Sequence, residues 1–569
     1  MAPCWWIRGN DARGTIRPKR IPAIDKISGK SGGLKAGQIK QLQTLYRLRV
    51  SANEIISREM ARRISAVSAD IKRQVALLLS RKGQVACVIV GSRDRIWIPE
   101  LSGFRLGPGR LKGLRCVHTH LKGEPLSRED ITDLMLTGLD LMAAVAVNDD
   151  GLPGSISFAH ILPDNRSGKG YAVHQVPDIG QLLVDFKELI RSLEEELAGA
   201  AGGHALGRKE RAVLVGVTAG AAGRDEAAMD ELEALARSDG IDVVETVLQH
   251  VKKPDPRFLI RKGKLGDLAL RCLQTDANLM IFNNELSPAQ VKTLTDSTDL
   301  RIIDRSQLIL DIFSRRAVTR EGKIQVELAQ LKYLLPRLAT KNTAMSRLTG
   351  GIGGRGPGET KLEINRRRVR ERIARLNREL RDIRSQRAGR RHLRNKRGLP
   401  VISIVGYTNA GKSTLLNSMT HSHVAVGNRL FETLDPSSRR LRFPREREAI
   451  ITDTVGFIRD LPESLMEAFA ATLEELHDAD LLLHVVDAFA PRVAERIETV
   501  EDILERLELQ DIPRLLVLNK ADLMPPGESR MLAEKMGGVA VSATDPPSLI
   551  ALVEKIETFI WRGVSSPRT

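Results

Sequence analysis

Aromatic side chains are scarce in this sequence, in which Phe, Trp and Tyr make up 4% of 569 residues. Stacking of bases on aromatic rings is therefore a poor candidate for binding nucleic acid. The four cysteines include no close pair, which argues against a zinc ribbon and against a disulfide framework. No run approaches the roughly 18 apolar residues of a membrane span, and the N-terminus lacks the apolar core of a signal peptide. We therefore expect a cytoplasmic protein with no membrane span.

Positive charge, in contrast, is abundant. The chain has 88 Lys and Arg residues against 71 Asp and Glu residues, a net charge of +17. Such an excess indicates a polyanionic partner, either nucleic acid or a membrane surface. The length exceeds what one core supports, so we expect several domains. We expect a monomer, although nothing in the sequence bears on oligomeric state.

Apolar runs that alternate with helical patterns predict an α/β fold for the whole chain. The predicted strands include VACVIV (85–90), LMAAVAV (141–147), AVLVGV (212–217) and NLMIF (278–282). The predicted order is a flexible basic leader (1–45), an α/β extension of unknown role (46–197), a linker (198–209), a second α/β domain (210–350), a glycine-rich loop with a basic helical hairpin (351–397), and a C-terminal α/β domain (398–565).

Most of the excess charge lies in residues 361–397, which hold 16 Lys and Arg against 4 Asp and Glu, a net of +12. Apolar residues recur there at helical spacing and predict an amphipathic helix; they are Val369, Ile373, Leu376, Leu380 and Ile383. One interpretation is a solvated helix face. We favour contact with nucleic acid, because so one-sided a charge repels itself unless a polyanion screens it. The segment lacks the bulky apolar face of a helix that lies on a membrane.

Residues 401–419, VISIVGYTNAGKSTLLNSM, predict a strand, a glycine loop and a helix. The pattern G-x-x-x-x-G-K-[ST] is filled by Gly406, Gly411, Lys412 and Ser413. Backbone N–H groups of such a loop converge on phosphates at the positive end of the helix dipole. Lys412 would reach the β- and γ-phosphates, and the Ser413 hydroxyl would ligate Mg²⁺. The sequence therefore predicts a P-loop.

Two further segments complete the predicted phosphate site. ITDTVGF (451–457) ends a strand with Asp453, placed to hold Mg²⁺ through water, and Gly456 offers an N–H to the γ-phosphate. FETLDPSSR (431–439) supplies Thr433 as a second hydroxyl ligand of Mg²⁺. We expect Lys412, Thr433 and Gly456 to act in catalysis.

The base would be selected by RLLVLNKADL (514–523). Asp522 can accept hydrogen bonds from N1–H and the 2-amino group of guanine, which adenine lacks, while Asn519 fixes the ring edge. The Ser542–Ala543 backbone would close over the base. These signals predict a Ras-like GTPase domain in 398–565. Its expected nucleotide-binding residues are Gly406, Tyr407, Thr408, Asn409, Ala410, Gly411, Lys412, Ser413, Thr414, Phe431, Glu432, Thr433, Leu434, Asp435, Asp453, Thr454, Val455, Gly456, Asn519, Lys520, Ala521, Asp522, Ser542, Ala543 and Thr544.

Phe457 follows Gly456, where signalling GTPases carry a glutamine that orients the attacking water. Without a polar side chain there, we expect slow intrinsic hydrolysis. A partner, a bound cation or a backbone group must then position the water.

Residues 206–565 resemble the HflX family of ribosome-associated GTPases. The marks are IRKGK (260–264), NNELSPAQ (283–290), DRSQLILDIF (304–313), REGKIQVELAQLKYLLPRL (320–338), SRLTGGIGGRGPGETKLE (346–363), GYTNAGKST, FETLDP and DTVGF. The resemblance implies an N-terminal α/β domain in 206–350 and a basic helical hairpin in 355–397. It implies binding to the large (50S) ribosomal subunit and its rRNA, GTP hydrolysis stimulated by the ribosome, and splitting of stalled or idle ribosomes.

The resemblance also bears on individual residues. Asn409 matches a position that supports K⁺ in related GTPases. The glycine-rich loop and the hairpin would approach rRNA, and double-stranded RNA is bound mostly through shape and phosphates. The arginines expected to bind RNA are Arg355, Arg366, Arg367, Arg368, Arg390, Arg391 and Arg394.

Residues 1–205 are an extension that we do not associate with typical family members. CVHTHLKGEPLSREDITDLMLTG (116–138) faintly resembles the His-x-His…Ser-x-x-Asp signature of JAMM/RadC-like metal-binding domains. His118, His120 and Asp130 would be the ligands, with Ser127 nearby. The spacing from histidine to serine is one residue short, and no suitable glutamate lies upstream. We therefore do not expect zinc in the extension.

Two alternative functions remain open at this point. The chain could be an RNA-binding factor that uses GTP as a timer during large-subunit maturation. Alternatively, the extension could be a metallohydrolase that the GTPase regulates.

Overall fold

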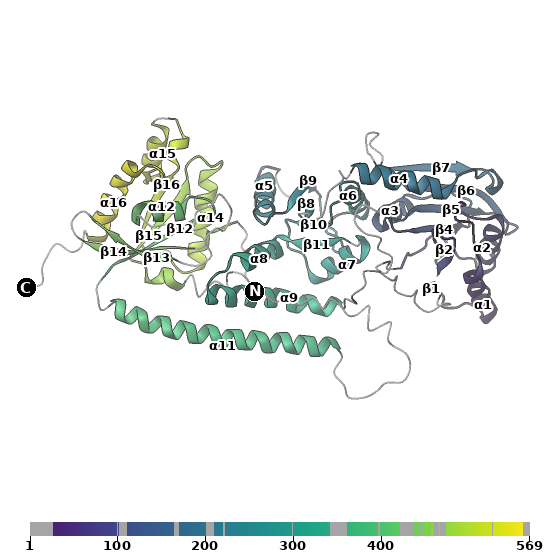
Figure 1. Ribbon diagram of the computed structural model, residues 1–569, viewed down its shortest axis with the longest axis horizontal. Coiled ribbons are helices and arrows are strands. Elements are labelled where there is room, and N and C mark those ends of the chain that lie inside the picture. Colours follow the sequence, from purple (N-terminus) through teal and green to yellow (C-terminus); the bar gives the residue numbers. More distant parts are fainter. Residues whose placement is uncertain are drawn as a thin grey trace, which may run out of the picture. The chain divides into compact units, whose positions relative to one another are not determined.

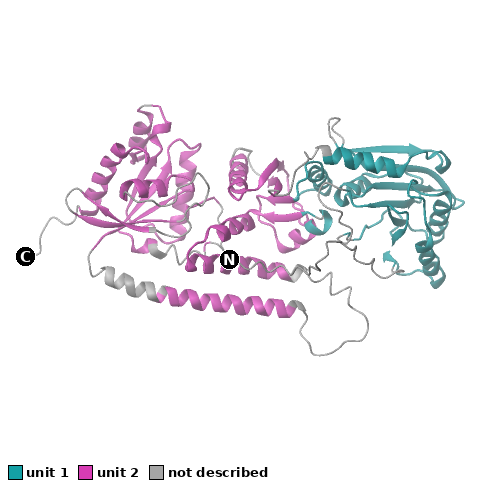
Figure 2. Cartoon of the chain, viewed as in Figure 1, with its two compact units in different colours: residues 1–208, 260–278, 295–300 teal, residues 209–259, 279–294, 301–569 magenta. Residues whose placement is uncertain are grey.

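The computed structural model divides into two compact units (Figures 1 and 2). Unit 1 comprises residues 1–208, 260–278 and 295–300, and unit 2 comprises residues 209–259, 279–294 and 301–569. The structure describes residues 27–561 except for 100, 102–110, 164–169, 201–209, 220–221, 299, 342–360, 396–398, 421–436, 444–446, 455, 460–465, 467–473 and 526. None of the helices in these described ranges is long and apolar enough to cross a membrane.

Unit 1 is built on a seven-stranded sheet with the order β1-β3-β2-β4-β5-β6-β7. Strands β4 and β5 are parallel, as are β1 and β3, and the other neighbours are antiparallel. All seven residues of both β4 and β5 are buried, which places this parallel pair in the middle of the core. The strands are β1 (Ser28–Gly29), β2 (Val75–Ser80), β3 (Val85–Val90), β4 (Leu114–His120), β5 (Leu141–Val147), β6 (Pro153–Ile161) and β7 (Tyr171–Val176).

Four α-helices accompany this sheet: α1 (Ala36–Thr44), α2 (Arg58–Ile71), α3 (Arg128–Thr137) and α4 (Phe186–Ala200). The prediction of a flexible leader over 1–45 is wrong for its second half. β1 pairs with β3, and Leu42 and Leu45 lie fully inside the core of unit 1. Two leucines three residues apart suffice to anchor one face of a short helix, even in a segment rich in Gly and Lys. The predicted linker 198–209 lies mostly outside the described residues.

Unit 2 begins with a four-stranded parallel sheet of the order β11-β10-β8-β9. Its strands are β8 (Arg211–Thr218), β9 (Asp242–His250), β10 (Leu279–Phe282) and β11 (Arg301–Asp304). The predicted strands in this part of the chain are therefore confirmed. The helices along this part of the chain are α5 (Ala222–Ser238), α6 (Lys262–Gln274), α7 (Pro288–Thr298), α8 (Arg305–Arg316) and α9 (Arg320–Lys341). The residues of α6 group with unit 1.

The basic segment forms one 35-residue helix, α11 (Lys361–Asn395), rather than a hairpin of its own. Its partner is α9, and the ion pairs Arg372–Glu327 (2.6 Å) and Arg320–Glu379 (3.8 Å) show that the two helices run antiparallel. The predicted apolar stripe is confirmed for four of its five residues, because Ile373, Leu376, Leu380 and Ile383 pack with Ile324, Leu328 and Leu331 of α9. The hairpin boundary at 351 is therefore wrong: one arm is α9, which begins at Arg320. Helical periodicity shows which face of α11 is buried but not which helix covers it.

The buried carboxylate of Asp304 holds α9 against the four-stranded sheet. Asp304 caps the N-terminus of α8 by accepting a hydrogen bond from the Gln307 N–H. It also accepts hydrogen bonds from the Tyr333 hydroxyl (2.7 Å), the Arg337 guanidinium (3.1 Å) and the Leu286 N–H (3.1 Å). Both carboxylate oxygens are thus engaged without water, as a buried charge requires.

The C-terminal part of unit 2 is a six-stranded sheet of the order β13-β14-β12-β15-β16-β17, with β13 antiparallel to the others. The helices α12 and α16 share a core on one face, while α14 contributes to the core that also includes α5 and α8. The predicted α/β fold with a Ras-like domain is confirmed. The elements are β12 (Val401–Gly406), α12 (Lys412–Thr420), β13 (Ser437–Arg442), β14 (Glu448–Asp453), β15 (Leu481–Asp487), α14 (Val493–Arg506), β16 (Arg514–Asn519), α15 (Glu528–Met536), β17 (Val539–Ala540) and α16 (Pro546–Trp561).

Candidate nucleotide-binding site

The loop between β12 and α12 needs glycine at two positions. Gly406 has φ +148, and a Cβ there would lie 2.1 Å from the Val485 carbonyl oxygen. Gly411 has φ +87, and a Cβ there would lie 2.3 Å from the Asn519 side-chain nitrogen. Both backbone conformations are ones that side chains rarely adopt. Asn409 has φ +62, a value that asparagine tolerates better than most residues. The glycines of the sequence motif are therefore required by the path of the loop.

Lys412 opens helix α12 and turns back over the loop. Its Nζ donates a hydrogen bond to the Tyr407 carbonyl at 2.9 Å. Burial lowers the pKa of Lys412 to about 8, although the nearby Asp453 carboxylate acts in the opposite direction. A phosphate placed in the loop would stabilise the protonated amine, because opposite charges favour the charged form. The amine is thus held in the loop, beside the backbone that would surround the phosphates.

Ser413 and Asp453 meet at the opening of the loop. The Ser413 hydroxyl donates a hydrogen bond to Asp453 Oδ2 at 2.6 Å, and Asp453 is fully buried. A hydroxyl and a carboxylate are hard oxygen donors of the kind that Mg²⁺ selects. The residues present therefore fit a Mg²⁺ ion shared with phosphates, and Ser413 would ligate it while Asp453 would act through water.

Gly456 is crowded by the same loop. A Cβ at this position would lie 2.9 Å from Lys412 Nζ and 2.9 Å from Thr408 Cγ2. Only glycine can bring this backbone so close to the lysine that faces the phosphates. The neighbouring Thr454 hydroxyl donates to the Ile404 carbonyl at 2.6 Å, which ties the end of β14 to β12.

The structure does not describe the segment expected to supply the second hydroxyl ligand. Of the predicted nucleotide-binding residues, Phe431, Glu432, Thr433, Leu434, Asp435 and Val455 lie outside the described residues. The roles of Thr433 as Mg²⁺ ligand and catalytic residue therefore stay predictions.

Phe457 has a structural role that the sequence did not indicate. Its side chain is buried in the core that α5, α8 and the GTPase sheet share. Its backbone N–H donates to the Gly406 carbonyl at 3.1 Å, and its carbonyl accepts from the Thr408 N–H at 2.8 Å. These two bonds extend the sheet by one bridge from Tyr407 to Phe457. The side chain therefore points into the core and has no polar atom with which to orient a water.

Asn519 connects three motifs of the site. Its side-chain amide donates to the Ala410 carbonyl at 2.8 Å, and its side-chain oxygen accepts from the Ala543 N–H at 2.9 Å. Asn519 thus joins the P-loop to the loop that was predicted to close over the base. Its side chain therefore has a structural role between these two loops, and the predicted contact with the ring edge stays a prediction.

The residues expected to meet guanine surround this connection. Asp522 lies in a short turn after β16 with an exposed side chain, available to a ligand. Lys520 has φ +62, and its amine pairs with Asp487 at 2.7 Å, which fixes the turn. The Ser542 and Thr544 hydroxyls lie 2.9 Å apart. The P-loop, the segment after β14, the turn after β16 and the segment after β17 thus lie at the same edge of the sheet.

The sequence reasoning missed a polar network next to the P-loop. The Tyr407 hydroxyl donates to Glu231 of α5 at 2.5 Å and accepts from the Arg459 N–H at 2.9 Å. Arg305 of α8 pairs with the same Glu231 at 2.6 Å and donates to the Arg459 carbonyl at 3.1 Å. These four residues, here called the Tyr407 network, link the α/β domain predicted for residues 210–350 to the nucleotide loop. No short motif contains them, because they come from four segments distant in sequence.

A cavity of about 360 Å³ adjoins the Tyr407 network. It lies between α5, the P-loop and α14, and its lining includes Tyr407, Thr408, Asn409, Glu231 and Arg496. The loop is therefore not tightly packed on this side, which leaves room for it to change shape.

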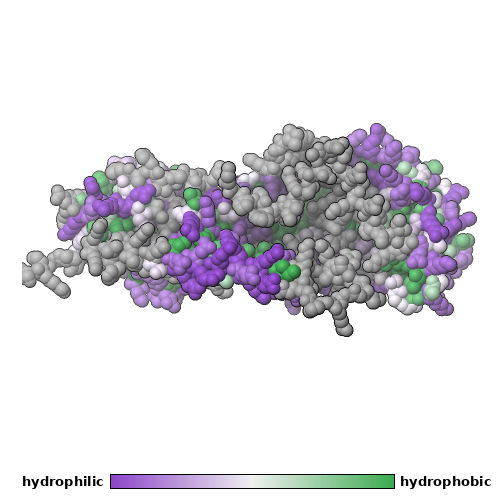
Figure 3. Space-filling model, turned by 60° about the horizontal axis from the view of Figure 1, so that its bottom comes forward, coloured by the Kyte–Doolittle hydropathy of each residue, from purple (hydrophilic) through white to green (hydrophobic). Residues whose placement is uncertain are grey.

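The predicted RNA-binding arginines are only partly described. Arg366 is half-buried on α11, whereas Arg367 and Arg368 are exposed. Further exposed arginines on the same helix are Arg370, Arg375, Arg378 and Arg381. The surface along α11 is almost uniformly hydrophilic in Figure 3. Arg355 lies outside the described residues, as do the side chains of Arg390, Arg391 and Arg394.

The three residues considered above as metal ligands lie in unit 1. There, His118, His120 and Asp130 approach one another closely enough to share a metal ion.

Three family models match successive parts of the chain. Residues 226–314 match the model described as GTP-binding GTPase N-terminal. Residues 316–394 match the GTP-binding GTPase Middle Region, and residues 401–520 match the 50S ribosome-binding GTPase model. The matches follow the order of the α/β domain, the hairpin and the P-loop domain described above.

Curated relatives cover the same part of the chain. GTPase HflX of Caldanaerobacter subterraneus subsp. tengcongensis is 46% identical over 357 residues, which span 62% of this chain and 81% of the relative. GTPase HflX of Alkalihalophilus pseudofirmus is 44% identical over 63% of this chain and 84% of the relative. GTPase HflX of Escherichia coli is 45% identical over 54% of this chain and 72% of the relative.

Solved structures give a more distant likeness. A GTP-binding protein from Sulfolobus solfataricus in complex with GDP is 25% identical, with 62% of this chain and 99% of that chain covered. The TM-score is 0.35, so this likeness does not bear on the arrangement of the domains.

Replacing Asp522 with Asn should weaken GTP binding by roughly 100-fold or more, because two hydrogen bonds to a charged acceptor are lost or reversed. The amide can instead donate to the 2-oxo group of xanthine, so the variant should bind xanthosine triphosphate better than the wild type does. Fluorescence titration with labelled nucleotides measures both affinities. Asp545→Asn, an exposed acid in the neighbouring loop, is the control. Unchanged GTP affinity in D522N would contradict the assignment.

Replacing Tyr407 with Phe keeps the ring but removes two hydrogen bonds of the Tyr407 network, at a cost of about 1–3 kcal/mol. We expect a non-hydrolysable GTP analogue to slow amide hydrogen exchange in α5 of the wild type, and to do so much less in Y407F. Mass spectrometry of peptides from 222–238 measures this difference. Tyr333→Phe, which removes a hydroxyl from Asp304 instead, is the matched control. Equal protection of α5 in Y407F and wild type would show that the network does not link the two domains.

Proposed function

We propose that this chain, which belongs to the HflX family of GTPases and hydrolyses GTP, acts on the large ribosomal subunit and uses the GTP cycle to dissociate stalled or idle ribosomes. The observation that carries the proposal is the exposed basic face of α11. Its apolar face is buried against α9, so the charged face is the one left for a partner. The apolar side chain of Phe457 also supports the proposal, because it cannot orient the attacking water and a partner could do so instead.

The basic face of α11 suits RNA phosphates. Among the described side chains of α11, six arginines are exposed, whereas Arg372 is paired bidentately with Glu327 of α9. Guanidinium groups bind phosphate oxygens in a fixed fork geometry, and A-form RNA presents phosphates regularly along its grooves. Aromatic platforms are not required for this kind of contact. We infer that α11, together with the arginines of residues 351–397, lies along rRNA.

The nucleotide site supports a switch that depends on a partner. Lys412, Ser413 and Asp453 are placed for phosphates and Mg²⁺, with Thr433 as the second hydroxyl ligand. Phe457 offers no polar group to the attacking water. A partner that orders the loops around the phosphates, or a K⁺ ion supported by Asn409, would supply the missing positioning. The basic hairpin favours the ribosome as this partner, because its arginines suit rRNA. We infer a cytoplasmic protein that acts as a monomer.

Purified 50S particles should raise the GTPase rate well above that of the protein alone. Replacing Arg366, Arg367 and Arg368 with Glu should reduce the ratio of stimulated to unstimulated rate by at least about tenfold, because several phosphate contacts are lost. Phosphate release at several salt concentrations measures the ratio and its salt dependence. The control carries the same charge change on unit 1, at the exposed residues Arg62, Arg63 and Lys187. Absence of stimulation in the wild type would refute ribosome coupling.

The same site and the same hairpin would serve a maturation factor for the large subunit that uses GTP as a timer. Sedimentation separates the two functions. A splitting factor should convert 70S particles into free subunits when protein and GTP are added, and should do so less with D522N. Stable 70S particles, together with intact 50S stimulation, would favour maturation instead.

A further inference from the structure

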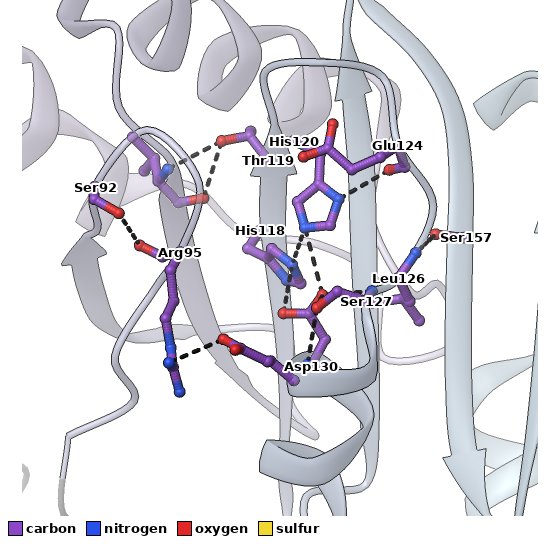
Figure 4. A network of polar contacts seen from close by, with 12 residues as sticks. Ser92, Arg95, His118, Thr119, His120, Glu124, Leu126, Ser127, Asp130 and Ser157 are labelled. Carbon is purple, nitrogen blue, oxygen red and sulfur yellow. Dashed lines mark hydrogen bonds and ion pairs between the residues drawn. The ribbon is translucent and has the colours of Figure 1, made fainter.

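We propose that His118, His120 and Asp130 of unit 1 form a binding site for a single zinc-class divalent cation. The two imidazoles and the carboxylate point toward one another in Figure 4. Their ligand atoms all lie within 4.8 Å of one another. Within the part of the chain that the structure describes, these three residues form a group that could hold a metal ion. The site lies outside the GTPase domain, and the proposal does not depend on the ribosomal function.

The distances within the cluster are close to those of a tetrahedral site. His118 Nε2 and His120 Nε2 are 2.9 Å apart. Asp130 Oδ1 lies 3.4 Å from His118 Nε2, and Asp130 Oδ2 lies 3.5 Å from His120 Nε2. Zinc binds nitrogen and oxygen at about 2.0–2.2 Å, so neighbouring ligands of a tetrahedral zinc are about 3.3–3.5 Å apart. Small shifts of the two rings would place all three ligands around one ion.

The fold places these ligands by simple rules. His118 and His120 are two residues apart on β4, and alternate side chains of a strand share a face. Asp130 lies in the first turn of α3, directly after the loop that follows β4. The sequence spacing from histidine to serine, which argued against zinc, does not prevent the three side chains from meeting. A loop one residue shorter still brings the first turn of α3 over the strand.

Ser127 anchors the carboxylate. Its backbone N–H and its hydroxyl both donate to Asp130 Oδ2, at 2.8 Å and 2.6 Å. Asp130 Oδ1, in contrast, faces His118 and is the oxygen that would ligate the ion. Hydrogen bonds to one oxygen of a ligating carboxylate are typical of the groups that surround metal ligands. They hold the carboxylate in place before the ion arrives.

The loop also fixes the ring of His120. Its Nδ1 lies 2.8 Å from the Glu124 carbonyl oxygen. A carbonyl only accepts, so Nδ1 carries a proton, which leaves Nε2, on the side of His118 and Asp130, as the nitrogen that can ligate an ion. Histidines that bind zinc usually donate their second N–H in this way.

The cluster is buried, with His118 0%, His120 3% and Asp130 8% exposed. Three ligands of borderline hardness suit zinc and related d-block ions better than Mg²⁺ or Ca²⁺, which prefer oxygen alone. A tetrahedron with three protein ligands leaves one position for water or another ligand. The structure therefore assigns a zinc-class site with one open position.

The test uses the full-length chain without a histidine tag. The protein is stripped with a chelator, titrated with Zn²⁺, desalted and analysed by plasma mass spectrometry. We expect one zinc per wild-type chain. Asp130→Asn keeps the shape of the side chain but removes its charge, and should lower zinc affinity by at least about tenfold. His174→Gln is the matched control, because His174 and His160 also approach each other (3.3 Å) on neighbouring strands.

Two measurements on the wild type need no variant. Zinc should raise the unfolding temperature of the stripped protein, because a ligand that binds only the folded state stabilises it. Co²⁺ should give the strong visible absorption of tetrahedral coordination. Circular dichroism checks that D130N is folded. The proposal is overturned if the stripped wild type takes up no stoichiometric zinc, if folded D130N binds zinc like the wild type, or if H174Q abolishes binding.

Discussion

The carboxylate of Glu231 holds the two halves of unit 2 together. One of its oxygens accepts the Tyr407 hydroxyl and the other pairs with Arg305. Removing Arg305 would leave this largely buried carboxylate without its ion-pair partner, typically at a cost of about 3–5 kcal/mol. Loss of the Tyr407 hydroxyl costs less, about 1–3 kcal/mol. Tyr407 follows the first glycine of the P-loop. The backbone that surrounds the phosphates is therefore attached to helices α5 and α8, and the GTPase domain is not mechanically independent of the domain before it.

Phe457 shows how the same attachment limits catalysis. Its ring lies in the core shared by both domains, and its backbone bonds hold Gly406 and Thr408. A side chain committed to packing cannot also orient water. The position that signalling GTPases use for chemistry holds a core residue here, which leaves the positioning of the water to a backbone group, a cation or a partner. In the proposed function, stability of the loop and dependence on a partner therefore have one cause.

Local patterns predicted where the motifs of the nucleotide site lie in the fold, because each motif is a short segment that follows one strand of a parallel sheet. Gly406, Lys412, Ser413, Asp453 and Asp522 lie where strand order places them. Contacts between distant segments were not predictable. The apolar stripe of α11 indicated a buried face but not α9 as its cover, and Glu231 has no sequence signal that pairs it with Tyr407. The leader was misjudged because Leu42 and Leu45 are too few to stand out in a basic segment. At His118 and Asp130, the spacing counted in residues did not show that the two side chains approach each other.

The hairpin and the P-loop are connected by a continuous series of contacts within unit 2. Helix α11 packs on α9, and α9 is held by Asp304 through Tyr333 and Arg337. Asp304 caps α8, and the next residue, Arg305, pairs with Glu231, which holds the P-loop through Tyr407. A series of contacts couples two sites only if one of its residues can adopt two conformations. The cavity beside Tyr407 makes this residue the member with room to move, whereas the fully buried Asp304 has none. A ribosome that shifted α11 would therefore act on the nucleotide at the Tyr407 network, and nucleotide binding would act on α11 through the same residues.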